Sequence, residues 1–196
     1  MTVLCIACDL DGTLAASKSA ITPQMARMIE HLLFSYDFAI ISWGWRPQFQ
    51  KQVIAQLKLT DEQAKRLHLL PTCGTQYRRW NGTEFALVAS KPFPEDDKEN
   101  LKKALIDALH HFWRYPEQVR WDIVEDRMTQ MTLSTFGQQA PLNIKEARDP
   151  ESTKRQQIID LVAPQFPAYT FRSGWTTSID ITATWIDKTS LMIFLL

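Results

Sequence analysis

Two carboxylates two residues apart give the sequence its clearest chemical signal. Asp9 and Asp11 belong to the string DLDGTL, which follows directly after a short apolar run. In open α/β sheets ligands bind at the carboxyl ends of the strands, so both side chains can face one site if Gly12 permits a tight turn there. One carboxylate can attack a phosphorus centre while the other protonates the leaving oxygen, and the pair also suits Mg²⁺. The alternative is a plain loop whose acidic residues cap a helix.

The elements that must position these carboxylates alternate between strand and helix patterns. The apolar run from Val3 to Cys8 is typical of a parallel strand covered on both faces. The elements expected next are a helix beginning at Thr22-Pro23, a strand from Phe38 to Ile41, a helix opened by Pro47, a short helix with a capping-box signal at Thr60 and Gln63, and a strand from Leu69 to Thr72. This order predicts an α/β fold with a doubly wound parallel-sheet core.

The pattern changes in the second half of the chain. The segments 77–80 and 83–88 predict a hairpin with the two-residue turn Asn81-Gly82. The further elements expected are a linker at 91–94, a long helix beginning near Glu95, strands at 120–124, 128–136, 169–172 and 178–184, and a helix around 152–162. We therefore expect an α+β unit, residues 90–184, inserted into a Rossmann-like core formed by residues 1–89 and 185–196.

Composition limits the classes of partner. Lys+Arg 22 against Asp+Glu 22 gives a formal net charge of zero in 196 residues, which argues against a nucleic-acid coat or a polybasic membrane binder. No apolar run approaches the roughly 18 residues that a membrane span needs. The first residues lack the basic region of a signal peptide, and three cysteines cannot all pair. We expect a reduced, cytoplasmic protein.

The string DLDGTL resembles the first motif of the haloacid dehalogenase superfamily of phosphotransferases. The resemblance implies that Asp9 is the nucleophile that forms an aspartyl-phosphate and that Asp11 is the general acid/base. It also implies Mg²⁺ as cofactor, held by the Asp9 carboxylate and the Asp11 backbone carbonyl. Gly12 and Thr13 complete the motif and would lie against the substrate phosphoryl group.

Two further motifs of that superfamily have counterparts here. Ser42 fits the second motif, whose hydroxyl binds the phosphoryl group, although the surrounding Ser42-Trp43-Gly44-Trp45-Arg46 departs from the usual glycine-rich pattern. We expect Gly44 to contribute to that phosphoryl-binding loop. Lys188 fits the third-motif lysine, which offsets negative charge on the nucleophile and on the phosphoryl group.

The insert between the second and third motifs is similar to the large α/β cap of one subclass, which includes phosphomannomutases and related sugar-phosphate phosphatases. By that resemblance Arg127 and Arg148 bind the distal phosphate or sugar, and Ser178 and Asp180 line the sugar site. The alternatives are that both arginines are ordinary surface residues and that the Ser178/Asp180 face is a solvated side of a sheet.

The superfamily also has a fourth motif, an acidic pair that adds Mg²⁺ ligands, and no counterpart follows Lys188. We therefore expect a C-terminally truncated relative in which the strand from Val3 to Cys8 is an open edge that favours a homo-oligomer. Three functions stay open: a sugar-phosphate phosphatase, a phosphomannomutase, and a catalytically impaired protein that only binds sugar phosphate. In each the partner is a small phosphorylated sugar, with no nucleic acid and no membrane.

Overall fold

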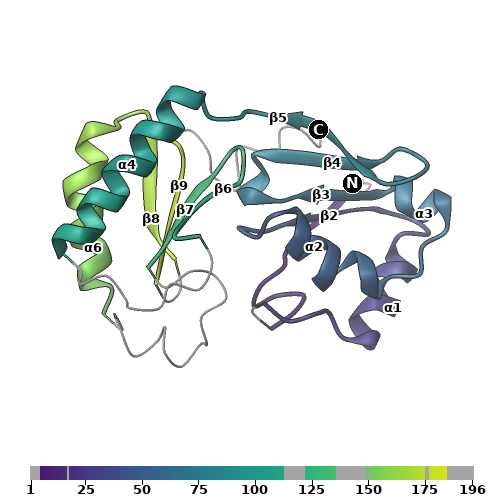
Figure 1. Ribbon diagram of the computed structural model, residues 1–196. Helices are drawn as coiled ribbons and strands as arrows, with labels where there is room; N and C mark the ends of the chain where they lie inside the picture. Colours follow the sequence, from purple (N-terminus) through teal and green to yellow (C-terminus); the bar gives the residue numbers. More distant parts are fainter. Residues whose placement is uncertain are drawn as a thin grey trace. The chain divides into compact units, whose positions relative to one another are not determined.

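The chain divides into two compact units at the Pro-rich segment that follows the hairpin. The computed structural model describes residues 5–16, 18–112, 122–135, 149, 151–174 and 177–184 (Figure 1). The first unit includes the described residues up to Lys91, and the second begins at Pro92. The sequence placed this division at residues 89/90.

A five-stranded sheet forms the centre of the first unit (Figure 1). Its order is β1 (Cys5–Asp9), β2 (Asp37–Ile41), β3 (Leu67–Leu70), β4 (Gln76–Trp80) and β5 (Phe85–Ser90). The first three strands are parallel, and the hairpin of β4 and β5 continues the sheet in antiparallel pairing. The predicted α/β class is confirmed, and the sheet is mixed because the hairpin joins the core sheet.

The helices of the first unit begin where the capping signals are. Before α1 (Pro23–Leu32), the Thr22 hydroxyl accepts a hydrogen bond from the Met25 amide at 3.2 Å. A complete capping box of Thr60 and Gln63 opens α3 (Asp61–Lys65), as the sequence predicted. The other helical elements are α2 (Arg46–Gln52) and the 3₁₀ turns η1 (Ile54–Gln56) and η2 (Thr72–Gly74).

The predicted two-residue hairpin turn is wrong. Trp80 pairs directly with Phe85, so the loop has four residues. The Asn81 side-chain oxygen accepts hydrogen bonds from the amides of Thr83 and Glu84, both at 2.9 Å. The asparagine thus stabilises a longer turn through its side chain, a competing use of Asn that the Asn-Gly pattern alone does not reveal.

Alternation along β2 assigns the two faces of the sheet. Phe38 and Ile40 pack with residues of α1 and α2 in the main core cluster of this unit, whereas Ala39 and Ile41 belong to a separate small cluster. Both helices lie on the same side of the sheet in Figure 1. The main core of the first unit therefore lies between α1, α2 and one face of the sheet.

The second unit is a four-stranded antiparallel sheet with helices on one face (Figure 1). The strand order is β6 (Val124–Asp126), β7 (Met131–Ser134), β9 (Ser178–Ala183) and β8 (Tyr169–Ser173). The helical elements are α4 (Glu95–Phe112), α6 (Thr153–Val162) and the 3₁₀ turn η3 (Ala163–Gln165).

Hydrophobic side chains join these helices to the sheet. Leu101 and Leu105 of α4, Ile158 of α6 and Ile179 and Ile181 of β9 are fully buried in one cluster. Because side chains alternate along β9, Ser178, Asp180 and Thr182 lie on the opposite face. No helix within the described residues is long and apolar enough to cross a membrane.

We predict that His68 makes the first unit acid-sensitive. Burial, together with the nearby charge of Arg79, lowers the pKa of His68 below 6.5 although Asp37 opposes this shift. Its Nδ1 lies 2.7 Å from the Tyr77 hydroxyl and its Nε2 lies 3.3 Å from Asp37, which suits a neutral ring. As pH falls, His68 therefore binds a proton at a higher pH in the unfolded chain than in the folded protein. The contribution of neutral His68 to stability should be complete above pH 6.5 and be lost as pH falls through the lower pKa of the folded state.

Urea unfolding midpoints between pH 8 and pH 5 test this prediction. The midpoint of His68→Asn should fall less over this range than that of the parent protein. His31→Asn, at an exposed position on α1, is the matched control and should keep the parental pH dependence. Equal pH dependence in all three proteins would contradict the assignment.

Candidate active site

The chain turns back immediately after β1, and this turn holds the two carboxylates. The amides of Leu14 and Ala15 both donate to the Leu10 carbonyl at 3.0 Å, and the Gly12 amide donates to the Ala15 carbonyl at 2.7 Å. Gly12 has φ +81°, a conformation that favours glycine. Leu10 is fully buried, so it anchors the turn while Gly12 and Thr13 remain exposed.

The Ser42 hydroxyl connects the ends of β1 and β2. It donates to a carboxylate oxygen of Asp11 at 3.3 Å and accepts a hydrogen bond from the Gly44 amide at 3.0 Å. The other Asp11 oxygen accepts from the Lys18 amide at 2.8 Å. Since Ser42 is only 1% exposed, both its hydroxyl and the Asp11 carboxylate have a fixed direction.

The segment after β3 supports this arrangement from the third strand. The Thr72 amide donates to the Gly44 carbonyl and the Cys73 amide to the Ser42 carbonyl, both at 2.8 Å. Thr72 and Cys73 have φ +53° and +56°, an uncommon conformation for residues with a side chain. A hydrogen bond between the Thr72 and Thr75 hydroxyls, at 2.7 Å, helps to hold this strained turn.

Carboxylates are the nucleophiles that this end of the sheet offers. Asp9 ends β1, and one of its oxygens accepts from the Leu10 amide at 2.9 Å. Burial raises the pKa of Cys5 and of Cys8, and Asp37 raises that of Cys5 further, so the nucleophilic thiolate form of both residues is disfavoured. Asp9 and Asp11 are thus two carboxylates on one turn, a pair that could divide nucleophilic attack and proton transfer between them.

The oxygen donors also bear on a metal ion. No group of three or more His, Cys, Asp or Glu side chains within the described residues could hold a metal by itself. Mg²⁺ is commonly bound through one or two carboxylates together with water and substrate phosphate oxygens. Asp9 and Asp11 fit that partial donor set because both supply hard oxygen ligands at the same turn.

A polar row crosses the second unit on the face away from its helices. Strand register aligns Glu125, Thr132, Asp180 and Arg172 side by side. One Asp180 oxygen accepts hydrogen bonds from Thr132 at 2.8 Å and from Gln130 at 2.9 Å. Hydroxyl, amide, carboxylate and guanidinium groups thus lie together on the face of the sheet away from the helices.

Arg127 follows β6 directly and is not an ordinary surface arginine. Its guanidinium donates twice to one Glu125 carboxylate oxygen, at 2.8 and 3.1 Å, and its side chain is only 8% exposed. Because Glu125 compensates the charge of Arg127, the buried pair carries little net charge.

The predicted site residues therefore fall into three groups. Asp9, Asp11, Gly12, Thr13, Ser42 and Gly44 are gathered at the carboxyl ends of β1 and β2 in the first unit. Arg127, Ser178 and Asp180 lie in the second unit. Arg148 and Lys188 lie outside the described residues, so their roles stay predictions.

Several supporting residues of the site were not predicted from the sequence. Thr72 and Thr75 hold the third loop of the site, and Gln130, Thr132 and Arg172 belong to the polar row. The sequence could have indicated Thr72 and Thr75, because the carboxyl end of a third parallel strand must lie beside the carboxyl ends of the first two strands. Membership in the polar row depends on strand register, for which the sequence offered no marker.

Substitution of Gly12 tests the turn directly. An added Cβ would meet no atom within 4 Å, so the cost of Gly12→Ala comes from the backbone conformation alone. We expect a loss of about 1 kcal/mol in the free energy of unfolding. Gly12→Asn should cost less, since Asn tolerates this region better. Urea unfolding of both variants measures the difference, and an equal or larger loss in Gly12→Asn would contradict the argument.

Comparisons with known proteins place this geometry in a fold family. No protein-family model and no curated sequence matches the chain. Among solved structures, it is similar to a haloacid dehalogenase-like hydrolase from Bacteroides thetaiotaomicron, with 12% identity, a TM-score of 0.72, and coverage of 100% of this chain and 76% of that one.

Two further solved structures share the architecture. A trehalose-6-phosphate phosphatase related protein has 16% identity and a TM-score of 0.57, with 97% and 72% of the two chains covered. The IMP-nucleotidase of Plasmodium falciparum has 14% identity and a TM-score of 0.64, with 98% of this chain and 49% of that one covered. With the DLDGTL turn at the end of its first strand, this chain has the α/β fold of the haloacid dehalogenase-like hydrolases.

Proposed function

We propose that this protein is a phosphatase of the haloacid dehalogenase type that hydrolyses a sugar phosphate through an aspartyl-phosphate. The observation that carries the proposal is the fixed contact between Ser42 and Asp11 beside Asp9, at the carboxyl ends of adjacent parallel strands. Phosphatases and a nucleotidase among proteins of the same fold support the reaction class.

The reaction divides into two steps with separate roles for the carboxylates. An Asp9 oxygen attacks phosphorus and forms an acyl-phosphate bond, while the bond from phosphorus to the sugar oxygen breaks and Asp11 donates its proton to that oxygen. Asp11 then removes a proton from water, which attacks phosphorus and releases Asp9 with inorganic phosphate. Ser42 acts as a positioning residue, because its hydroxyl fixes one oxygen of Asp11.

Mg²⁺ fits this proposal as cofactor, held by Asp9 and Asp11 together with water and substrate oxygens. When bound, it would offset the negative charge of the carboxylates and of the phosphoryl group. The residues that approach the phosphoryl group besides these two are Gly12 and Thr13 of the exposed turn and the Gly44 segment.

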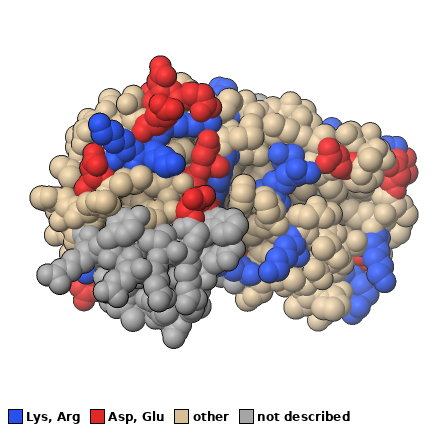
Figure 2. Space-filling view, in the orientation of Figure 1, with Lys and Arg blue, Asp and Glu red and all other residues tan. Residues whose placement is uncertain are grey.

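The second unit supports a sugar as the organic part of the substrate. Its polar row offers acceptors at Asp180 and Glu125 and a donor at Arg172, a mixture that suits several hydroxyl groups. On the visible face in Figure 2, acidic and basic side chains lie close to one another in both units. That distribution, with zero net charge, suits a small ligand better than a nucleic acid.

Replacement of the nucleophile tests the reaction. Asp9→Asn should abolish Mg²⁺-dependent hydrolysis of p-nitrophenyl phosphate, because an amide forms no acyl-phosphate, whereas Asp11→Asn should slow the turnover and let the phosphoenzyme accumulate. Release of p-nitrophenol and trapping of the acid-stable phosphoprotein measure these two effects.

The matched control is Asp61→Asn, which changes an exposed carboxylate on α3 and should leave hydrolysis unchanged. Retained activity in Asp9→Asn would refute the proposal. Transfer of the phosphoryl group to a second hexose phosphate instead of water would identify a mutase, and binding without turnover would identify a silent relative.

A second experiment addresses the sugar. Asp180→Asn keeps an oxygen that can accept from Thr132 and Gln130 but removes the charge. We expect KM for a hexose 6-phosphate to rise about tenfold, the loss of one charge-assisted hydrogen bond, while kinetics with p-nitrophenyl phosphate stay unchanged. Asp160→Asn, on the exposed side of α6, is the control. Equal losses on both substrates would assign Asp180 a structural role.

A further inference from the structure

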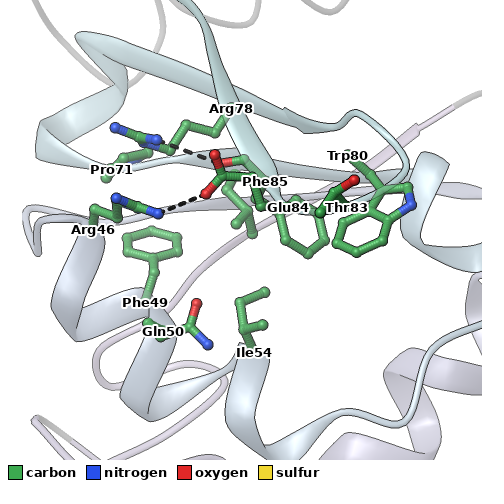
Figure 3. A pocket seen from close by; sticks show the side chains of 11 residues that line it. Arg46, Phe49, Gln50, Ile54, Pro71, Arg78, Trp80, Thr83, Glu84 and Phe85 are labelled. Carbon is green, nitrogen blue, oxygen red and sulfur yellow. Dashed lines mark hydrogen bonds and ion pairs between the residues drawn. The ribbon is translucent and has the colours of Figure 1, made fainter. Parts of the chain in front are cut away.

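The first unit contains a pocket that the proposed reaction does not use. It has a volume of about 240 Å³ and lies between α2 with η1 on one side and the ends of β3, β4 and β5 on the other (Figure 3). Apolar side chains form most of its wall: Phe49, Ile54, Leu69, Pro71, Trp80 and Phe85. An apolar pocket with a few polar groups at one end is the usual form of a small-molecule site.

Two arginines give this pocket a charged end. Figure 3 shows the guanidinium groups of Arg46 and Arg78 at one end and the Trp80 ring at the other. Arg78 is half-buried, and it donates hydrogen bonds to neutral oxygens, the Phe85 carbonyl at 3.3 Å and the Gln76 amide at 3.5 Å. Its buried Nε has no hydrogen-bond partner within the described structure. A partly desolvated guanidinium whose Nε lacks a hydrogen-bond partner favours an incoming anion.

Arg46 can join the same anion at small cost. It pairs with Glu84 at 2.9 Å, but the side chains of that pair are 56% and 58% exposed. Ion pairs so exposed contribute little to stability, so Arg46 can turn part of its fork toward a ligand. Two arginines and one glutamate leave one net positive charge, which a monoanion neutralises and a phosphate dianion would exceed.

Size and wall chemistry define the rest of the ligand. The volume is below the ~300–1,000 Å³ of pockets for drug-sized molecules, so a single ring with a short acidic arm suits it. Trp80 and Phe85, with ring centroids 5.3 Å apart, supply an aromatic surface for that ring. Planar guanidinium groups bind carboxylates through paired hydrogen bonds.

We propose that this pocket is a binding site for a small aromatic carboxylate, separate from the carboxylate pair at the end of β1. Two residues of its wall, Arg46 and Pro71, directly adjoin loops of the carboxylate site in the chain. Arg46 opens α2 directly after the Ser42–Trp45 loop, and Pro71 precedes the Thr72 turn that hydrogen-bonds Ser42 and Gly44. An occupant therefore rests against both segments that hold the phosphoryl-binding loop.

Calorimetric titration of the full chain with phenylacetate tests the proposal, and phenylacetamide is the neutral control of the same shape. We expect phenylacetate to bind at one site and phenylacetamide to bind at least about tenfold more weakly. Arg78→Met should weaken phenylacetate binding by about tenfold or more, because it removes the buried charge but keeps an apolar stem. Arg79→Met changes the next arginine on β4, which is exposed and outside the pocket, and should bind as the parent does.

Two further variants separate this result from misfolding and from the proposed reaction. Ile54→Phe adds a ring to the apolar end of the pocket, leaves the arginines in place and should also prevent binding. Asp9→Asn should bind phenylacetate normally, whatever its effect on hydrolysis. Equal binding of phenylacetate and phenylacetamide, unchanged binding in Arg78→Met, or preferential binding of inorganic phosphate at the same arginines would each overturn the proposal.

Discussion

Parallel pairing of β1 with β2 is the constraint on which the candidate site depends. The register sets Asp9 opposite Ile41, so the next residues of both strands leave the sheet at the same edge. Ser42 then lies within hydrogen-bond distance of Asp11 across 31 positions of sequence. A shift of one residue would turn the side chains of one strand to the opposite face and separate this pair.

The third strand adds a second level of support. Its carboxyl end continues into the left-handed turn at Thr72 and Cys73, and the amides of that turn hold the carbonyls of Ser42 and Gly44. The departure of the Ser42–Arg46 loop from a glycine-rich pattern is thus compensated by hydrogen bonds from the neighbouring loop. The strained backbone of Thr72 and Cys73 thus directs the two amides that order the Ser42–Arg46 loop.

The two units carry different kinds of chemistry. The first presents carboxylates on a tight turn, whereas the second presents a row of mixed hydrogen-bonding groups on an antiparallel sheet whose other face is packed by α4 and α6. The arginine pocket near α2 is a third feature of the molecule, a mostly apolar cavity with Arg46 and Arg78 at one end.

The sequence by itself determined the α/β class, the order of strands and helices, the caps at Thr22 and Thr60 and the position of the Asp9/Asp11 turn, because these features depend on local patterns of apolar residues and short-range hydrogen bonds. The four-residue hairpin loop escaped it, since the Asn81 side chain competes with the turn that Asn-Gly usually favours.

Only the tertiary structure decided which distant residues meet. The contact of Ser42 with Asp11 and the row through Thr132, Asp180 and Arg172 follow from strand register. Register is set by packing of whole faces and not by the residues that it brings together, so no local pattern in the sequence announces these contacts.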